Sequence, residues 1–225
     1  MSILKLVQYG FALPTAMFLV ASFARAQERS EAPAIVTRYC SGCHGMDGRS
    51  QLPYIPRLAG MGVQYLETKF ASYQEAPAAP VDEAFNKIAH IGNSNKPMGL
   101  TGAANVNMVG VAHFVSEEDK DAAIGWYASR PPAPGKNRKG KAIEEGRKLF
   151  INGLPSRGLY ACQACHGANG QGTDTVPRLA GQNADYLIGQ LAVFRAGERR
   201  LTMTDIARRL EDNEVRAVAA YLQSR

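Results

Sequence analysis

The chain has 225 residues, of which 45% are hydrophobic, so it is too apolar to be disordered and long enough for one large domain or two small ones. Its formal net charge of +6 is a weak argument for nucleic-acid binding, and we expect no nucleic-acid partner. The densest positive run, residues 136–141, adjoins a proline-rich stretch and indicates a solvated linker.

The first 26 residues are typical of a secretory signal peptide. Lys5 provides a positive start, residues 13–21 an apolar core, and residues 24–26 (Ala-Arg-Ala) a cleavage site. An uncleaved membrane anchor is the alternative, but Pro14 interrupts the stretch, which falls short of the roughly 20 apolar residues of a spanning helix. We therefore expect an exported chain that loses residues 1–26.

All four cysteines lie in two copies of the pattern Cys-x-x-Cys-His. The copies consist of Cys40, Cys43 and His44, and of Cys162, Cys165 and His166. A c-type haem needs two thiols for thioether bonds to its vinyl groups and a neighbouring imidazole for its iron, and this pattern supplies all three on one helical turn. The sequence therefore predicts two covalently bound haem c groups, with the two histidines as proximal iron ligands.

Two other kinds of site use the same residue types. A zinc site could pool thiolates and imidazoles from both motifs in a tetrahedral set. A thioredoxin-like redox pair would use Cys-x-x-Cys, but it would not need the histidine that follows in both copies. The export signal, the duplicated motif and the absence of any further cysteine favour haem attachment.

An internal repeat surrounds the two motifs. The segments IPRLAG at 55–60 and VPRLAG at 176–181 match, as do residues 65–73 with 186–194 and residues 108–129 with 203–224. Equivalent positions lie 121 residues apart in the block at 65–73 but 95 apart in the last block, so the first copy carries about 26 extra residues. Segment 75–107, rich in Ala, Pro, Gly and Asn, is where we place this insertion.

The repeat predicts two tandem domains built from helices. We expect an N-terminal domain over residues 27–130, a linker over 131–140 that is rich in proline and glycine, and a C-terminal domain over 141–225. No segment shows sustained strand alternation, so the predicted fold class is all-α. The expected helices cover residues 28–39, 64–73, 117–129, 141–151, 183–194 and 212–224. Ser116 is expected to cap the third of these, whose first turn is acidic.

The sixth iron position needs a ligand from further along each repeat, and a methionine thioether raises the reduction potential of a haem. Met203 is the only methionine after His166, so it is the candidate for the second haem. Met108 occupies the equivalent position in the first copy and is favoured there. Met98, which follows a proline, stays open as its rival. A histidine, His113 or His90, is the less favoured alternative.

Other repeated residues suggest supporting roles. The carbonyls of Pro56 and Pro177 are suitable partners for the second nitrogen of each ligand histidine. Arg57 and Arg178 could pair with haem propionates, because a guanidinium recognises carboxylates. A solvated surface charge is the alternative for both arginines. Tyr65 and Tyr186 could also bind propionates, although core packing explains these two tyrosines nearly as well.

With these motifs the sequence resembles the dihaem cytochrome c4 family, whose members join two class I cytochrome c domains. The resemblance covers CSGCHGMDG, CQACHGANG, both PRLAG segments and the terminal AVAAYLQS. It implies His/Met ligation of both irons and electron transfer in the periplasm between a membrane donor and a terminal acceptor. These roles carry over to His44, His166, Met203 and Met108, and the insertion at 75–107 is the departure from the family pattern.

Three functions fit this pattern. The first is a periplasmic electron carrier of a respiratory chain, without substrate chemistry, whose partners are a membrane electron donor and a terminal oxidase or reductase. Peripheral association with the membrane is compatible with it. The second is a dihaem peroxidase, in which one iron keeps an open site. The third is an electron-accepting subunit of a periplasmic dehydrogenase, with the insertion as its contact surface.

Overall fold

The computed structural model describes residues 31–77, 103–136, 138–197 and 202–225. Contacts divide the chain into two units, Met1–Ala32 and Pro33–Arg225, and the helices described below belong to the second unit. The predicted signal peptide at 1–26 lies outside the described residues, as do Met98 and His90.

The first Cys-x-x-Cys-His motif lies on a continuous helical stretch. This stretch begins at Ala34 and contains a π-helical segment, η1 (Val36–Cys40), followed by α2 (Ser41–His44). The predicted helix at 28–39 was therefore wrong at its start, because residues 31–33 are not helical. Pro33 has no N–H to donate inside a helix, and its carbonyl accepts from the Val36 N–H at 2.9 Å, so the helical turn starts there.

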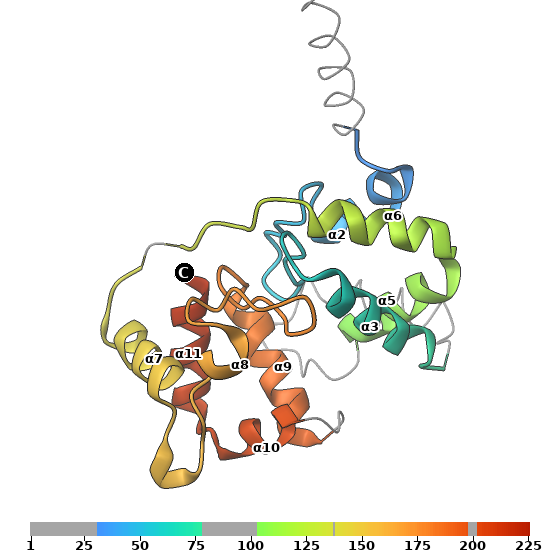
Figure 1. The fold of residues 1–225 in the computed structure, drawn as a ribbon. Helices are drawn as coiled ribbons and strands as arrows, with labels where there is room; N and C mark the ends of the chain where they lie inside the picture. Colours follow the sequence, from blue (N-terminus) through green and yellow to red (C-terminus); the bar gives the residue numbers. More distant parts are fainter. Residues whose placement is uncertain (1–30, 78–102, 137, 198–201) are drawn as a thin grey trace, which may run out of the picture. The chain divides into compact units, whose positions relative to one another are not determined.

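Three longer helices complete the first half: α3 (Val63–Gln74), α5 (Ala103–Phe114) and α6 (Glu117–Ala128) (Figure 1). The Ser116 cap is confirmed, since its hydroxyl accepts from the Asp119 N–H at 3.2 Å. Helix α5 was not predicted, and its first residues fall within the segment 75–107 that we assigned to the insertion. It packs against α3, and this packing stabilises a helix whose own sequence shows no clear helical pattern of apolar residues.

The second half repeats this arrangement in its own helices (Figure 1). They are α7 (Lys141–Asn152), the short 3₁₀ turn η3 (Pro155–Arg157), α8 (Gln163–His166), α9 (Ala184–Ala196), α10 (Thr202–Arg209) and α11 (Asp212–Gln223). The core lies where α7 crosses α11, around Phe150, Val218 and Tyr221. Gly146 allows this crossing, because a Cβ there would lie 2.0 Å from the Ala217 carbonyl oxygen.

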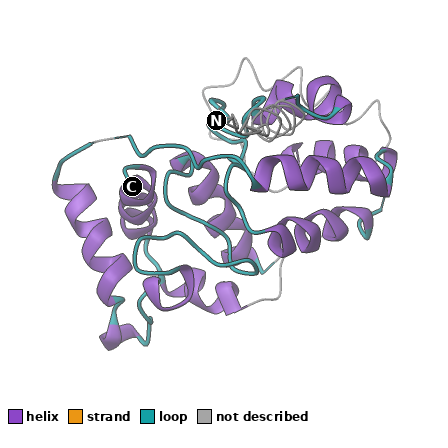
Figure 2. Cartoon of the chain, turned by 45° about the horizontal axis from the view of Figure 1, so that its top comes forward, coloured by secondary structure: helices purple, strands orange, loops and turns teal. Residues whose placement is uncertain are grey.

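The predicted all-α class is confirmed. Within the described residues the elements are helices joined by loops (Figure 2), and the sole strand-like feature is an isolated bridge between Leu154 and Leu159. In the same part of the chain, no helix has the length and apolar character needed to cross a membrane. The described residues of the predicted linker 131–140 are not helical before Gly140.

The two PRLAG segments contact each other. Arg57 Nη1 donates to the Gly181 carbonyl at 2.6 Å, and the Gln182 side chain pairs with the backbone of Arg57 at 2.8 and 3.0 Å. The buried Asn183 amide donates to the carbonyls of Leu52 and Ile55, both at 2.9 Å. The repeated segments therefore join the two halves through buried hydrogen bonds, which cost free energy if left unmade.

Candidate haem sites

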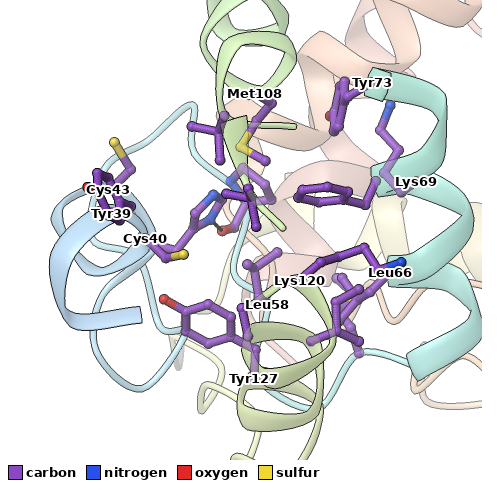
Figure 3. A pocket seen from close by; sticks show the side chains of 18 of the residues that line it. Tyr39, Cys40, Cys43, Leu58, Leu66, Lys69, Tyr73, Met108, Lys120 and Tyr127 are labelled. Carbon is purple, nitrogen blue, oxygen red and sulfur yellow. Dashed lines mark hydrogen bonds between the residues drawn. The ribbon is translucent and has the colours of Figure 1, made fainter. Parts of the chain in front are cut away.

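A large, mostly apolar cavity that opens to solvent lies in the first half, and the space between its walls, the open part included, is about 1070 Å³. Its lining includes Cys40, Cys43, His44 and Met108, the residues that the sequence predicted for the first haem. They come from η1, α2 and α5, while α3 and α6 close the remaining walls. Figure 3 shows Met108 reaching into this cavity from α5, with Cys40 bordering it on one side and Lys69 and Leu66 of α3 on the other.

The ring of His44 is held by the predicted carbonyl. Its Nδ1 lies 3.0 Å from the Pro56 carbonyl oxygen. A carbonyl can only accept, so Nδ1 carries the proton and Nε2 keeps a free lone pair. Burial lowers the pKa of His44, and the bond to Pro56 opposes this shift only in part. The imidazole is thus neutral, oriented and able to bind iron through Nε2.

The cysteines have the character of alkylation sites rather than of a redox pair. Cys40 is half-buried and Cys43 is exposed. Burial, with a smaller contribution from Cys43, raises the pKa of Cys40 to about 11. Redox-active Cys-x-x-Cys pairs have the opposite property, a lowered thiol pKa. No group of three His, Cys, Asp or Glu side chains suited to a metal ion occurs among the described residues.

The alternative distal ligands are placed unequally. Met61, which follows the first PRLAG segment and has Gln182 at the matching place of the repeat, also lines the cavity and is buried. His113 is exposed and its Nε2 lies 2.8 Å from the Ala76 carbonyl oxygen, so this nitrogen already has a partner. Met98 lies outside the described residues. The choice of Met108 over Met98 stays a prediction.

Two aromatic side chains that the sequence reasoning missed fix the turn after His44. The Tyr127 hydroxyl donates to the Gly45 carbonyl at 3.1 Å, and Trp126 Nε1 donates to the Met46 carbonyl at 2.8 Å. Tyr127 also lines the cavity and is 2% exposed. Their place on the closing helix of the repeat was the available signal, but the repeat has Tyr221 at the place of Trp126 and Leu222 at the place of Tyr127, so it does not predict these hydrogen bonds.

The second motif has the same local geometry as the first. His166 is buried, and its Nδ1 lies 3.0 Å from the Pro177 carbonyl oxygen, as predicted. Burial lowers the pKa of His166 and raises that of Cys162 to about 11. Met203 is half-buried on α10, which packs against α9. Its role as the second distal ligand stays a prediction.

The two repeated arginines are not solvated surface charges. Both line a small cavity that residues of the two PRLAG segments and Ala133 surround. Arg57 is 6% exposed and donates through Nε to the Ser50 carbonyl at 3.1 Å and through Nη1 to Gly181. Arg178 Nε is buried without a hydrogen-bond partner among the described residues. An unpartnered buried guanidinium N–H fits a carboxylate such as a haem propionate.

The donor set therefore fits covalent haem at both motifs. Each has two cysteine thiols, the first of which is kept neutral by a pKa raised through burial, and one neutral imidazole with a defined tautomer. The first also has a mostly apolar cavity that its two cysteines, its histidine and Met108 all line, as an apolar ring bound to them would require.

Comparisons with known proteins agree with this chemistry. Residues 143–225 match the family model described as "Cytochrome c". The chain is 30% identical to cytochrome c4 of Stutzerimonas stutzeri over 211 residues, which covers 91% of this chain and 92% of that protein. It is similar to the crystal structure of reduced cytochrome c4 from Pseudomonas stutzeri, with a TM-score of 0.67 at 30% identity, covering 86% of this chain and 99% of that one.

The chain belongs to the dihaem cytochrome c4 family. It therefore has two cytochrome c domains, and its two cysteine pairs carry two covalently bound haem c groups. Cytochromes of this family are electron carriers rather than enzymes, and a carrier requires redox partners. A further relative is a thiosulfate dehydrogenase electron acceptor of Stutzerimonas stutzeri (strain A1501). The two sequences are 30% identical over 192 residues, which cover 81% of this chain and 76% of that protein.

Proposed function

We propose that this member of the cytochrome c4 family carries electrons in the periplasm from a membrane-bound respiratory donor to a terminal oxidase or reductase. His44 and Met108 are the proposed ligands of the first iron, and His166 and Met203 those of the second. The observation that carries the proposal is the shared cavity of Cys40, Cys43, His44 and Met108. An iron with two protein ligands has no open site for a substrate, which suits a carrier.

The haem groups, once attached, supply one-electron redox chemistry. The residues of the chain orient the iron ligands and keep water away from the haem. The Pro56 and Pro177 carbonyls hold the two imidazoles, while Leu58, Leu66 and Ile124 give the first cavity apolar walls. We propose that Arg178 pairs with a propionate, supported by its unpartnered buried Nε. Arg57 is proposed for the same role, although two of its nitrogens already bind carbonyls.

Carbon monoxide tests the proposed ligation, because it binds a ferrous haem whose sixth position is open or easily vacated. The reduced protein is expected to show no carbon monoxide spectrum at neutral pH and no turnover of hydrogen peroxide. A carbon monoxide complex at one haem, together with consumption of peroxide, would contradict the carrier function and indicate a dihaem peroxidase. Export is tested by the N-terminal sequence of the mature protein, which is expected to begin at Gln27.

A second candidate function is electron acceptance from a periplasmic dehydrogenase. It is favoured by the relative named as a thiosulfate dehydrogenase electron acceptor and by the predicted insertion. Deletion of residues 78–102 is the appropriate test, because it leaves α3 and α5 complete, whereas deletion of 75–107 would remove the start of α5. Association with a dehydrogenase that is lost on this deletion supports the subunit function, and unchanged association counts against a contact through the insertion.

A further inference from the structure

The helix that carries each proposed distal methionine ends in two residues that tie it to the rest of its half. In the first half these are His113 and Phe114 at the end of α5, and in the second Arg208 and Arg209 at the end of α10. The two pairs occupy the same positions of the repeat. They lie five and six residues after the methionine, about one and a half helical turns.

One residue of each pair binds the end of the preceding helix. His113 Nε2 lies 2.8 Å from the carbonyl oxygen of Ala76, just after α3. Arg208 Nε donates to the carbonyl of Arg195, in the last turn of α9, at 3.3 Å. The Arg208 guanidinium lies over Gly197, where a Cβ would come within 2.7 Å of Nη2. The Arg195 carbonyl is one of the last four of α9, which lack partners within the helix, and the Ala76 carbonyl lies just beyond the C-cap of α3.

The other residue of each pair contacts the segment that leads into the cysteine motif. The Phe114 ring lies 5.3 Å, centroid to centroid, from the ring of Tyr39, which directly precedes Cys40. Arg209 Nη1 donates to the Arg157 carbonyl at 3.0 Å, in the turn before Cys162. We name the contacts of His113 and Phe114 the first latch and those of Arg208 and Arg209 the second latch. Each latch joins the proximal and distal sides of one haem site.

The two latches differ in chemistry. The second uses two charged guanidinium donors, and hydrogen bonds from charged donors are roughly twice as strong as neutral ones. It is reinforced by Arg195, which donates back to the carbonyls of Ala207 at 3.3 Å and Leu210 at 2.7 Å and pairs with Asp212 at 2.6 Å.

In the first half Gln74 stands at the position of Arg195, and its amide makes one hydrogen bond of 3.2 Å, to Glu117. Both rings of the aromatic contact in the first latch are exposed to solvent, Phe114 over 68% of its surface and Tyr39 over 53%. At the described C-terminal end of the first distal helix there is thus one polar contact, from an imidazole, and one exposed ring contact, whereas the end of the second has guanidinium donors from Arg208, Arg209 and Arg195.

We infer that the two latches position the distal methionines, and that the weaker first latch makes Met108 the ligand displaced first by a competing base. This inference rests on the proposed His/Met ligation. His113, Phe114, Arg208 and Arg209 are positioning residues, since they act on the iron through the helices that carry the methionines.

The test is a titration of the oxidised protein with imidazole, followed by the far-red sulfur-to-iron band and by the NMR signals of the two ligated methionine methyl groups. Met108→Ala and Met203→Ala assign each signal to its haem. We expect the Met108 signal to disappear at a lower imidazole concentration than the Met203 signal. Earlier loss of the Met203 signal, or simultaneous loss, would overturn the inference.

Matched variants separate a latch from a general effect on the fold. Arg208→Ala is expected to lower the apparent dissociation constant of imidazole by about fivefold at the second haem only, and His113→Ala to do so at the first only. Lys148→Ala, which removes an exposed charge from α7, is the control and should change neither. Arg208→Lys keeps the charge and should restore part of the effect. If both alanine variants titrate like the unaltered chain, the latches have no positioning role.

The ligation and the latches can fail separately. If Met108→Ala leaves the sulfur-to-iron band at full height, the ligand assignment at the first haem is wrong, but the response of the Met203 signal to Arg208→Ala still tests the second latch. If the band halves while the order of displacement is reversed, the ligands are right and the inference is wrong.

Discussion

Replacing Gly146 by alanine has two opposing effects on stability at the crossing of α7 and α11: a gain in helix propensity and a steric overlap between the helices. Alanine favours a helix over glycine by about 1 kcal/mol. The new Cβ would, however, lie 2.0 Å from the Ala217 carbonyl oxygen and 2.9 Å from Tyr221 Cβ. Ordinary van der Waals contact begins at 3.4 Å, so the two helices have to separate by about 1.4 Å, and such a gap forfeits about half of the dispersion attraction across it.

The separation weakens the contact of Phe150 with Tyr221, whose rings lie 5.6 Å apart at the centre of the second core. Overpacking of this kind costs about 1–3 kcal/mol, and the lost contacts add to it. After subtraction of the helix propensity we expect Gly146→Ala to lower the free energy of unfolding by about 2 kcal/mol. For a domain of this size that is a fall of about 10 °C in the melting midpoint.

The assay is thermal unfolding followed by helical circular dichroism and by the haem absorption band. Gly125→Ala on α6 is the matched control, because no atom lies within 4 Å of its added Cβ. It should raise the stability by about 0.5–1 kcal/mol. The reasoning is refuted if Gly146→Ala is as stable as the unaltered protein or more stable, since the α7–α11 crossing would then not need a glycine.

The other predictions concern ligands and charges. Met108→Ala should halve the far-red sulfur-to-iron band while Met98→Ala leaves it intact; the reverse outcome would move the first distal ligand into the insertion. Arg178→Gln should lower the reduction potential of one haem in an optical titration, because a buried positive charge disfavours the ferric state. An unchanged potential would show that Arg178 does not pair with a propionate. The hydrogen bond to Arg195 lowers the pKa of Asp212 below its usual 3.8. The ionised carboxylate therefore stabilises the folded protein above pH 3.8, and this stabilisation is lost as the pH falls through the pKa of the folded state. Asp212→Asn should therefore reduce stability near neutral pH but not in strong acid, as acid unfolding curves would show, and equal losses at both would exclude the ion pair as the cause.

Local chemistry made much of the site predictable. The cysteine motifs, the proline carbonyls that hold His44 and His166, and the Ser116 cap all depend on residues close in sequence. The repeat then extended each inference from one half to the other and identified the equivalent methionines, Met108 and Met203.

What the sequence did not reveal depends on contacts between distant residues. Helices α5 and α10 are short or rich in weak helix formers, and packing on α3 and α9 stabilises them rather than their own propensity. The position of Arg57 is set by Gly181, which lies 124 residues away along the chain. Likewise, no local pattern could show that Tyr127 binds the turn after His44.

An optical redox titration of the purified protein, with its haem content measured in the same sample, tests the central claim most directly. Two haems per chain that titrate as two one-electron transitions at high potential, with the sulfur-to-iron band present in the oxidised form, are the result expected for two His/Met-ligated haems. A low-potential transition at either haem, or the absence of that band, would contradict the proposed methionine ligation and with it Met108 and Met203 as distal ligands.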